Sequence, residues 1–313
     1  MADLGEMFGG GATATFLGLP AGDPAAPEGD IVIFGADCAT PYGSVGAYCA
    51  GGPAAIRAGG AAYSGDLGKV NFDLLGPVLP DGVRAVDAGD LPVDPADAAG
   101  NRDAIAGVVR RILAAGAVPV MLGGDDSLPI PMLQALADGG DPLTILQIDA
   151  HIDWRDAVEG EPLGLSSTMR RASEMAHVAR IIQVGARGIG SAGMAELQAA
   201  RDWGVHLIPA HAFTDPQAVA ELIPEGARVA ICFDCDALDP AIMPAVIAPT
   251  AGGLSYGQVL GLIRAVAARA QIAAFDMVEF MPARDRDGVG ARTAAQLLAS
   301  VLGLIGGQCA RAG

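Results

Sequence analysis

The sequence predicts an α/β fold of three layers, in which a doubly wound, mostly parallel sheet carries helices on both faces. Three apolar runs support this prediction, because each is four to six residues long and is bounded by Gly, Pro or Asp, as fully buried parallel strands are. Segments with the spacing of helices separate such runs, and this alternation favours parallel strands joined by right-handed crossovers. The three runs end near residues 123, 148 and 233.

The other elements continue this alternation along the chain. Strands are expected near residues 30–35, 180–185, 205–208, 228–234 and 272–279. Apolar residues at helical spacing predict helices over residues 101–115, 131–137, 169–177, 194–202, 216–222, 256–268 and 291–305.

One domain is expected to follow a short N-terminal arm. Residues 1–29 are rich in Gly, Ala and Pro and are expected to form an extended arm. Residues 30–313 are expected to form a single domain, because no linker-like segment or internal repeat interrupts residues 30–305. A Gly-rich loop at residues 38–51 would reach either the pocket or a neighbouring subunit.

Composition and charge restrict the partners and the compartment. The net charge of −17 argues against binding to nucleic acid or to an anionic membrane. The first residues lack a basic segment before an apolar core, and no charge-free apolar stretch reaches the roughly 20 residues of a membrane span. The five cysteines lack zinc-finger pairing, and the Cys232–Cys235 spacing lies on a strand rather than at the start of a helix. Buried, reduced thiols in a cytoplasmic protein are therefore expected.

Acidic side chains follow each of the three apolar runs. In an open α/β sheet, the loops after the carboxyl ends of the strands line the ligand crevice. Side chains alternate along an extended backbone, so Asp149, His151 and Asp153 point to one side, as do Asp234 and Asp236. So many converging carboxylates would repel one another unless cations lie among them. The alternative is that each Asp is only a turn former or a helix N-cap.

The ligand types favour a pair of divalent cations. Carboxylate-rich sets with one imidazole suit Mn²⁺ or another borderline ion better than structural zinc, which prefers thiolates and imidazoles. Two such ions about 3.5–4 Å apart can share a water molecule, lower its pKa and supply hydroxide at neutral pH. The sequence therefore predicts hydrolytic chemistry at this edge of the sheet.

In these blocks the chain resembles the ureohydrolase family of arginases, agmatinases and guanidino-acid hydrolases, and within it the agmatinase-like branch. The family's Gly-Gly-Asp-His-Ser, Asp-Ala-His-x-Asp and Ser-x-Asp-x-Asp-x-x-Asp-Pro blocks correspond to residues 123–127, 149–153 and 232–240. Residues 52–57, 249–254 and 276–282 resemble further family elements. The resemblance implies two metal ions, Mn²⁺ first and Ni²⁺ or Co²⁺ as alternatives, bound by Asp126, Asp149, His151, Asp153, Asp234 and Asp236.

Two positions depart from the family pattern. Asp126 stands where the family has a histidine ligand, and its carboxylate can reach the same coordination position. Five ligand carboxylates, two dications and a hydroxide would leave a charge of −2, against −1 for the family pattern, which favours a cationic substrate and raises the pKa of bound water. Ser166 stands in the place of a histidine associated with proton transfer, and serine cannot act as a general base near pH 7. At this position Ser166 is expected to contact the substrate.

The resemblance implies hydrolysis of a guanidino C–N bond by a ureohydrolase-like catalytic domain over residues 30–313. The substrate would be agmatine, a guanidino acid, a small alkylguanidine or a biguanide, and the products urea, or a urea-like compound, and an amine. Glu279 would meet the guanidinium group, and Asp236 would carry a proton to the leaving amine. The family commonly forms trimers or hexamers, so a homo-oligomer is expected. The alternative is a non-catalytic subunit that supports an active paralogue in a hetero-oligomer.

Three residues beside the blocks have two interpretations each. Trp154 would either wall the pocket and stack on the substrate cation or fill the core. Arg155 would either face the far end of the substrate or pair locally with an acidic neighbour. Asp125 is expected to orient its loop rather than bind metal.

Overall fold

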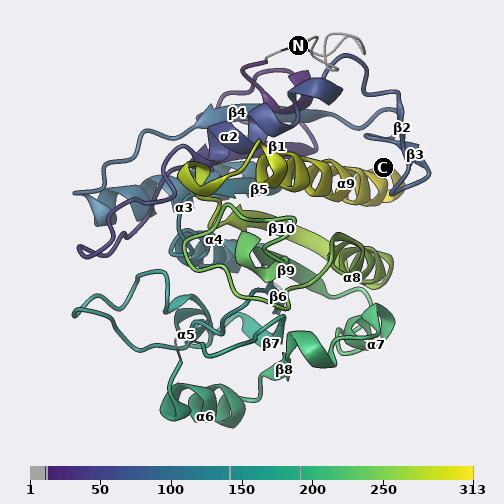
Figure 1. Ribbon diagram of the computed structural model, residues 1–313. Helices are drawn as coiled ribbons and strands as arrows, with labels where there is room; N and C mark the ends of the chain where they lie inside the picture. Colours follow the sequence, from purple (N-terminus) through teal and green to yellow (C-terminus); the bar gives the residue numbers. More distant parts are fainter. Residues whose placement is uncertain (1–10, 12, 141, 191, 313) are drawn as a thin grey trace.

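Eight parallel strands form the central sheet in the part of the protein that the structure describes. The computed structural model describes residues 11, 13–140, 142–190 and 192–312, so residues 1–10 and 12 of the expected arm lie outside the described residues. The strands follow one another in the order β4-β1-β5-β10-β9-β6-β7-β8, and every neighbouring pair is parallel (Figure 1). In chain order they are β1 (Ile31–Ala36), β4 (Ala85–Asp90), β5 (Val118–Gly123), β6 (Leu143–Ile148), β7 (Val178–Val184), β8 (His206–Ile208), β9 (Arg228–Asp234) and β10 (Gln271–Val278).

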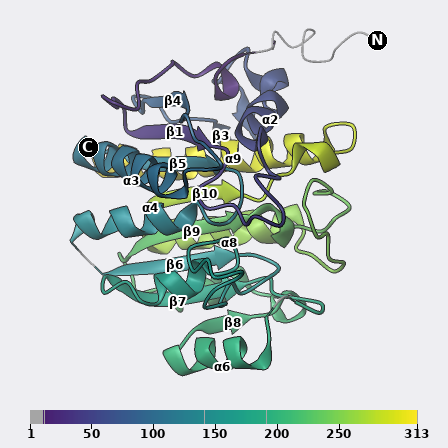
Figure 2. The same ribbon diagram turned by 90° about the vertical axis from the view of Figure 1, so that its left-hand side faces the viewer.

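Helices cover both faces of the sheet, so the predicted three-layer α/β class is confirmed (Figures 1 and 2). One face carries α3 (Ala98–Ala114), α4 (Pro129–Ala135), α5 (Thr168–Ala172) and α6 (Met194–Trp203). The other carries α2 (Gly52–Gly59), α7 (Pro216–Ala220), α8 (Tyr256–Arg269) and α9 (Val289–Ala312). A separate two-stranded sheet pairs β2 (Val70–Asn71) with β3 (Gly76–Pro77).

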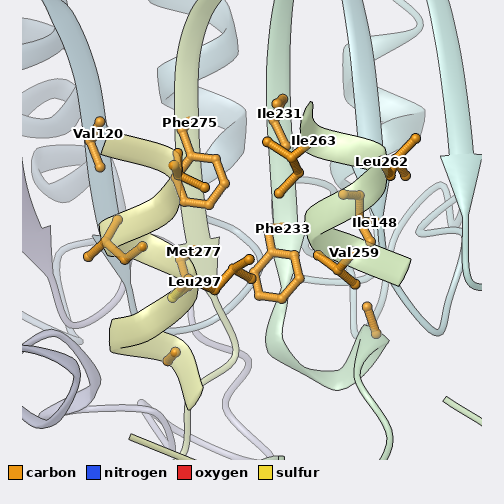
Figure 3. Close-up of a cluster of buried hydrophobic side chains, with 14 of the residues drawn as sticks. Val120, Ile148, Ile231, Phe233, Val259, Leu262, Ile263, Phe275, Met277 and Leu297 are labelled. Carbon is orange, nitrogen blue, oxygen red and sulfur yellow. The ribbon is translucent and has the colours of Figure 1, made fainter. Parts of the chain in front are cut away.

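Two hydrophobic clusters, one on each face, hold these layers together. On the face of α8 and α9, Phe233 and Phe275 stack with ring centroids 6.4 Å apart, and Leu262 and Leu297 pack over the strands (Figure 3). The α9 helix is long and apolar enough, by length and composition alone, to cross a membrane, but 67% of that window is buried inside the molecule. Such burial is that of a core helix.

Several predicted elements differ from the observed ones. The helix expected at residues 169–177 ends at Ala172, where the Ser173 hydroxyl donates to the Arg170 carbonyl and the chain turns into β7. The helix expected at residues 216–222 ends at Ala220. Strand β4 was not predicted, because its polar Asp87 and Asp90 interrupt the apolar pattern.

A buried ion pair explains those acidic residues in β4. The Arg57 guanidinium from α2 donates through Nε and Nη2 to the two oxygens of Asp87, at 2.7 and 2.9 Å, and through Nη1 to Asp90 at 2.5 Å. Asp87 also accepts the backbone N–H of Phe16, which is fully buried. The described part of residues 11–29 therefore packs on the edge of the sheet.

The strand order determines where the functional blocks meet. Strands β10 and β9 are the last two in the chain, yet they lie between β5 and β6. The four blocks that follow β5, β10, β9 and β6 consequently lie side by side at the carboxyl edge of the sheet, as expected for a ligand site in this class of fold.

Candidate metal centre

Two groups of ligand atoms meet at this edge. The first group is Asp126, Asp149 and Asp153, and the second is Asp149, His151 and Asp236; within each group the ligand atoms lie within 4.8 Å of one another. The groups share Asp149. The carboxylates are buried, whereas the His151 side chain keeps 24% of its surface exposed.

Hydrogen bonds hold the second group in place. The Nδ1 atom of His151 lies 3.0 Å from Asp236 Oδ2 and 3.4 Å from Asp149 Oδ1. The backbone N–H of Ala150 donates to Asp236 Oδ1, and that of His151 donates to Asp149 Oδ1. The chain bends directly after β6, at residues 149–151, and this bend brings the His151 N–H onto the side chain of Asp149, two residues before it.

Asp234 lies outside both groups but close to them. Its Oδ1 atom accepts the backbone N–H of Asp236 at 2.7 Å, as a cap on the short 3₁₀ helix η5 (Cys235–Ala237). Burial raises the pKa of Asp234 well above its usual value, and the charges of Asp236 and Asp149 raise it further. Asp234 therefore belongs to the same charge cluster.

The cluster carries more negative charge than the protein alone can stabilise. Burial, followed by the charge of Asp153, raises the pKa of Asp126; burial and the charge of Asp149 raise that of Asp153. Burial lowers the pKa of His151, but its bonds to Asp149 and Asp236 outweigh this and raise it to about 12. Divalent cations bound among these carboxylates would offset this repulsion and favour the ionised forms.

The residues present fit a pair of such cations. The Asp126 Oδ2 atom is buried and has no hydrogen-bond partner among the residues that the structure describes. A buried carboxylate oxygen without a donor is costly unless a cation faces it. Five carboxylates with one imidazole form the hard, oxygen-rich set that suits Mn²⁺ and related ions.

The first block holds Asp126 through its neighbours. Asp125 accepts the backbone N–H and the hydroxyl of Ser127, so it orients the loop as expected. The Thr168 hydroxyl donates to the carbonyl of Asp126. At Gly124 a Cβ atom would lie 1.7 Å from the carbonyl oxygen of Asp37, so only glycine lets these two loops pass.

Two site residues adopt backbone conformations that sequence patterns do not reveal. Asp153 has φ 49° and Glu279 has φ 63°, which is the left-handed region that side chains other than glycine rarely occupy. Strain of this kind collects at functional sites, where surrounding contacts hold it. Asp153 lies in the loop after β6, and Glu279 follows β10 directly; the side chain of Asp153 belongs to the first ligand group, and that of Glu279 bonds to the backbone of Asp126.

Glu279 lies beside the first block and is enclosed by the loop at residues 38–51. Its Oε1 atom accepts the backbone N–H of Asp126 at 2.9 Å, and both carboxylate oxygens accept from the Tyr48 hydroxyl. The Cys49 thiol lies 3.9 Å from Oε2. Burial raises the pKa of Glu279, and the hydrogen bond from Tyr48 lowers it; burial has the larger effect, so the pKa is about 8. This loop therefore reaches the site, and no pattern in the sequence singled out Tyr48.

The flanking residues take different places. Trp154 is buried in the core, with its ring centroid 6.4 Å from that of Trp203, so it fills the core and does not wall the pocket. Ser166 lies two residues before Thr168. Its backbone N–H donates to the Tyr42 hydroxyl, and its carbonyl accepts the backbone N–H of Arg155. Cys232 and Cys235 are buried in the opposite clusters, as alternation predicts for a pair without redox geometry.

Sequence reasoning also missed Gln147 and Gln183. Both are buried, on β6 and β7, where they are register partners. Gln147 lies two residues before Asp149 and therefore on the same side of the strand. Its polarity within an apolar run was the available signal.

Comparison with known proteins identifies the fold and the family. The chain is 33% identical over 298 residues to proclavaminate amidinohydrolase of Streptomyces clavuligerus, covering 92% of this chain and 91% of that protein. It is 32% identical over 248 residues to the mitochondrial guanidino acid hydrolase of Homo sapiens, covering 75% of this chain and 68% of that protein.

Solved structures give the same result. The structure of the Streptomyces clavuligerus enzyme superposes with a TM-score of 0.78 at 30% identity, covering 94% of this chain and 97% of that one. A hypothetical agmatinase from Burkholderia thailandensis gives a TM-score of 0.79 at 26% identity, with 96% and 92% covered. The arginase-family sequence model matches residues 29–303. The chain therefore belongs to the arginase family and is an enzyme of the ureohydrolase type.

Proposed function

We propose that this enzyme hydrolyses the C–N bond of a small guanidino compound and releases urea, or a urea-like product, and an amine. One observation carries the proposal: two acidic groups that share Asp149 lie beside Glu279, whose carboxylate is bonded to the backbone of Asp126. This places ligands for two cations next to an acceptor for a guanidinium ion. The agmatinase and guanidino acid hydrolase names among the relatives agree with such a substrate.

We assign the metal ligands as Asp126, Asp149, His151, Asp153, Asp234 and Asp236. The family binds two divalent cations, usually Mn²⁺, and we assign Mn²⁺ here, with Ni²⁺ or Co²⁺ as alternatives. Bound divalent cations would lower the pKa of water in the site and so supply hydroxide near neutral pH. Asp126 would take the position that the family gives to histidine, since its buried Oδ2 atom lacks a partner in the described part of the chain.

Glu279 would hold the substrate cation. A carboxylate accepts two parallel N–H groups of a planar guanidinium, which fixes the plane of the group as well as its position. The five acidic ligands add a field that favours a cation over a neutral amide. Binding at Glu279 would therefore direct the central carbon of the guanidinium towards the cluster.

Proton transfer would fall to the cluster itself. Asp236 already lies 3.0 Å from the His151 ring and can carry a proton towards the leaving amine. Ser166 cannot take the part of an imidazole base near neutral pH. We therefore expect slower turnover than in relatives that keep the histidine, and optimal activity at a higher pH. We expect a homo-oligomer, as is common in the family.

The test is a substrate panel on the purified full chain. The protein is stripped with a chelator, reloaded with Mn²⁺, Ni²⁺ or Co²⁺, and assayed for urea and amine with agmatine, guanidino acids, alkylguanidines and biguanides. We expect metal-dependent release from at least one compound and two metal ions per chain. Two bound ions without release from any compound would refute the proposed reaction and favour a supporting subunit. A metal content of one or none would refute the assigned ligand set.

A further inference from the structure

Trp154 takes part in a chain of hydrogen bonds that leads to the metal centre. Its indole Nε1 atom donates to Gln183 Oε1 at 3.2 Å. The Nε2 atom of Gln183 donates to Gln147 Oε1 and, at 2.8 Å, to the carbonyl of Ile152. The Nε2 atom of Gln147 donates to Asp149 Oδ2 at 2.7 Å and to Asp153 Oδ2 at 2.5 Å. Each step thus joins one buried side chain to the next.

The two ends of this chain fix its direction. An indole nitrogen can only donate, so Gln183 must turn its oxygen to Trp154 and its NH₂ group to Gln147. Gln147 must then accept with its oxygen, which leaves its NH₂ group for the carboxylates. Ionised carboxylates can only accept, so both ends require the same orientation of the two amides.

We propose that Trp154, Gln183 and Gln147 form a one-way donor chain that positions Asp149 and Asp153 for the cation bound by Asp126, Asp149 and Asp153. The inference rests on the metal centre assigned above. A donor on one oxygen of each aspartate fixes the rotation of its carboxylate and leaves the other lone pairs for the cation. A neutral amide does this without adding a positive charge that would compete with the metal. All three are positioning residues: Gln147 bonds to the ligand carboxylates, and Gln183 and Trp154 act through Gln147.

The shared ligand makes the effect unequal between the two groups. Gln147 contacts two of the three members of the first group but only Asp149 of the second. His151 and Asp236 are held instead by one another and by the backbone N–H of Ala150. Loss of the donor chain should therefore weaken one metal position much more than the other, and the second position serves as an internal control.

The test is a calorimetric titration of the chelator-stripped full chain with Mn²⁺. Gln147→Met keeps the length of the side chain and removes both donors. We expect affinity at one position to fall about 10- to 100-fold, as for other residues that hold ligands in place, while the other position changes only a few-fold. Gln183→Met and Trp154→Phe should weaken the same position less, because Gln147 is then free to turn.

Two further variants separate positioning from packing. If the residues act as a chain, Gln147→Met combined with Gln183→Met should bind Mn²⁺ no more weakly than Gln147→Met alone. Gln308→Met is the matched control: that amide bonds to the carbonyls of Ala267 and Ala270 and lies at the amino end of β10, away from the site. It should leave both affinities unchanged.

The outcomes are distinct. Wild-type affinity at both positions in Gln147→Met, or equal loss at both, would overturn the inference. If Gln147→Met does not fold, Trp154→Phe tests the inference instead. Wild-type Mn²⁺ affinity in Trp154→Phe would show that the indole does not position the ligands and would overturn the inference. Mn²⁺ binding at two positions without urea release would refute the proposed reaction alone. Absence of Mn²⁺ binding by the wild type would overturn both the metal centre and this inference.

Discussion

The Tyr48 hydroxyl lies 2.6 Å and 2.8 Å from the two carboxylate oxygens of Glu279. A phenol supplies a single proton, whereas a guanidinium ion offers two parallel N–H groups to the same pair of oxygens. Tyr48 therefore occupies the side of the carboxylate that a paired guanidinium contact requires. A guanidinium bound at Glu279, as proposed above, would displace this hydroxyl or share the carboxylate with it.

Glu279→Gln should reduce kcat/KM by about one to two orders of magnitude or more, because a charge-assisted pair in such a site contributes roughly 1.5–3 kcal/mol. Metal content should not change, since Glu279 is not assigned as a ligand. Steady-state kinetics and metal analysis of the same preparation check both points. Loss of metal, or full activity on every guanidino substrate, would show that another residue binds the substrate.

Tyr48→Phe should move the acidic limb of the kcat/KM profile to higher pH. The pKa of Glu279 is raised by burial, and the hydrogen bond from Tyr48 lowers it. Removing that bond raises the pKa further, so a higher pH is needed to ionise Glu279. The matched control is Tyr63→Phe, whose hydroxyl accepts from Gln296 instead. Identical profiles for Tyr48→Phe and the wild type would mean that Glu279 ionisation does not limit the reaction.

Asp126→Ala should lower metal occupancy and activity together, because it removes a carboxylate from the first ligand group. Asp126→His should preserve metal binding and strengthen it, since imidazole suits these ions and reduces the repulsion among the ligands. Metal analysis and kinetics on both variants provide the check. If metal occupancy and rate are unchanged in Asp126→Ala, Asp126 is not a metal ligand and only shapes its loop.

The metal-free protein should lose stability as pH rises. Burial raises the pKa of Asp276 from 3.8 to about 8, so between these values the folded state binds a proton that the unfolded chain has released. This contribution to stability is complete below the unfolded pKa and is lost as pH rises through the folded pKa. Urea unfolding in chelator at about pH 5 and about pH 8 measures the slope. Asp276→Asn should reduce the slope without abolishing it, because the raised pKa values of Asp126, Asp153 and Asp234 act in the same direction. An unchanged slope in this variant would contradict the contribution of Asp276.

Arg57→Ala should lower the free energy of unfolding by about 3–5 kcal/mol, because it leaves Asp87 as a buried charge without its cation. Arg110→Ala is the control, since its pair with Asp138 is exposed and spans 3.5 Å, and we expect less than about 1 kcal/mol there. Denaturant unfolding of the metal-free proteins compares the two. Equal effects would show that the buried pair does not stabilise the contact between α2 and β4.

The sequence by itself determined the α/β class and the composition of the acidic cluster. Fully buried strands appear as apolar runs, and the acidic residues after them marked the edge of the sheet where the cluster lies. The alternation predicted for Asp149, His151 and Asp153 does not explain their placement, because residues 149–151 form a bend and Asp153 has φ 49°. Local patterns of this kind record which residues are buried. Such patterns did not predict β4, because Asp87 and Asp90 interrupt its apolar residues. Both aspartates pair with Arg57 of α2, which the pattern along one strand cannot show.

Only the tertiary structure decided which groups touch. Tyr48 and Glu279 are 231 residues apart in the chain and meet because β10 is inserted beside β5. Trp154 is buried in the core, and its indole N–H donates to Gln183 on β7, a contact that no local pattern could reveal. The physical reason is that strand order and cross-strand pairing are set by packing over the whole sheet, whereas periodicity along one strand carries no record of its neighbours.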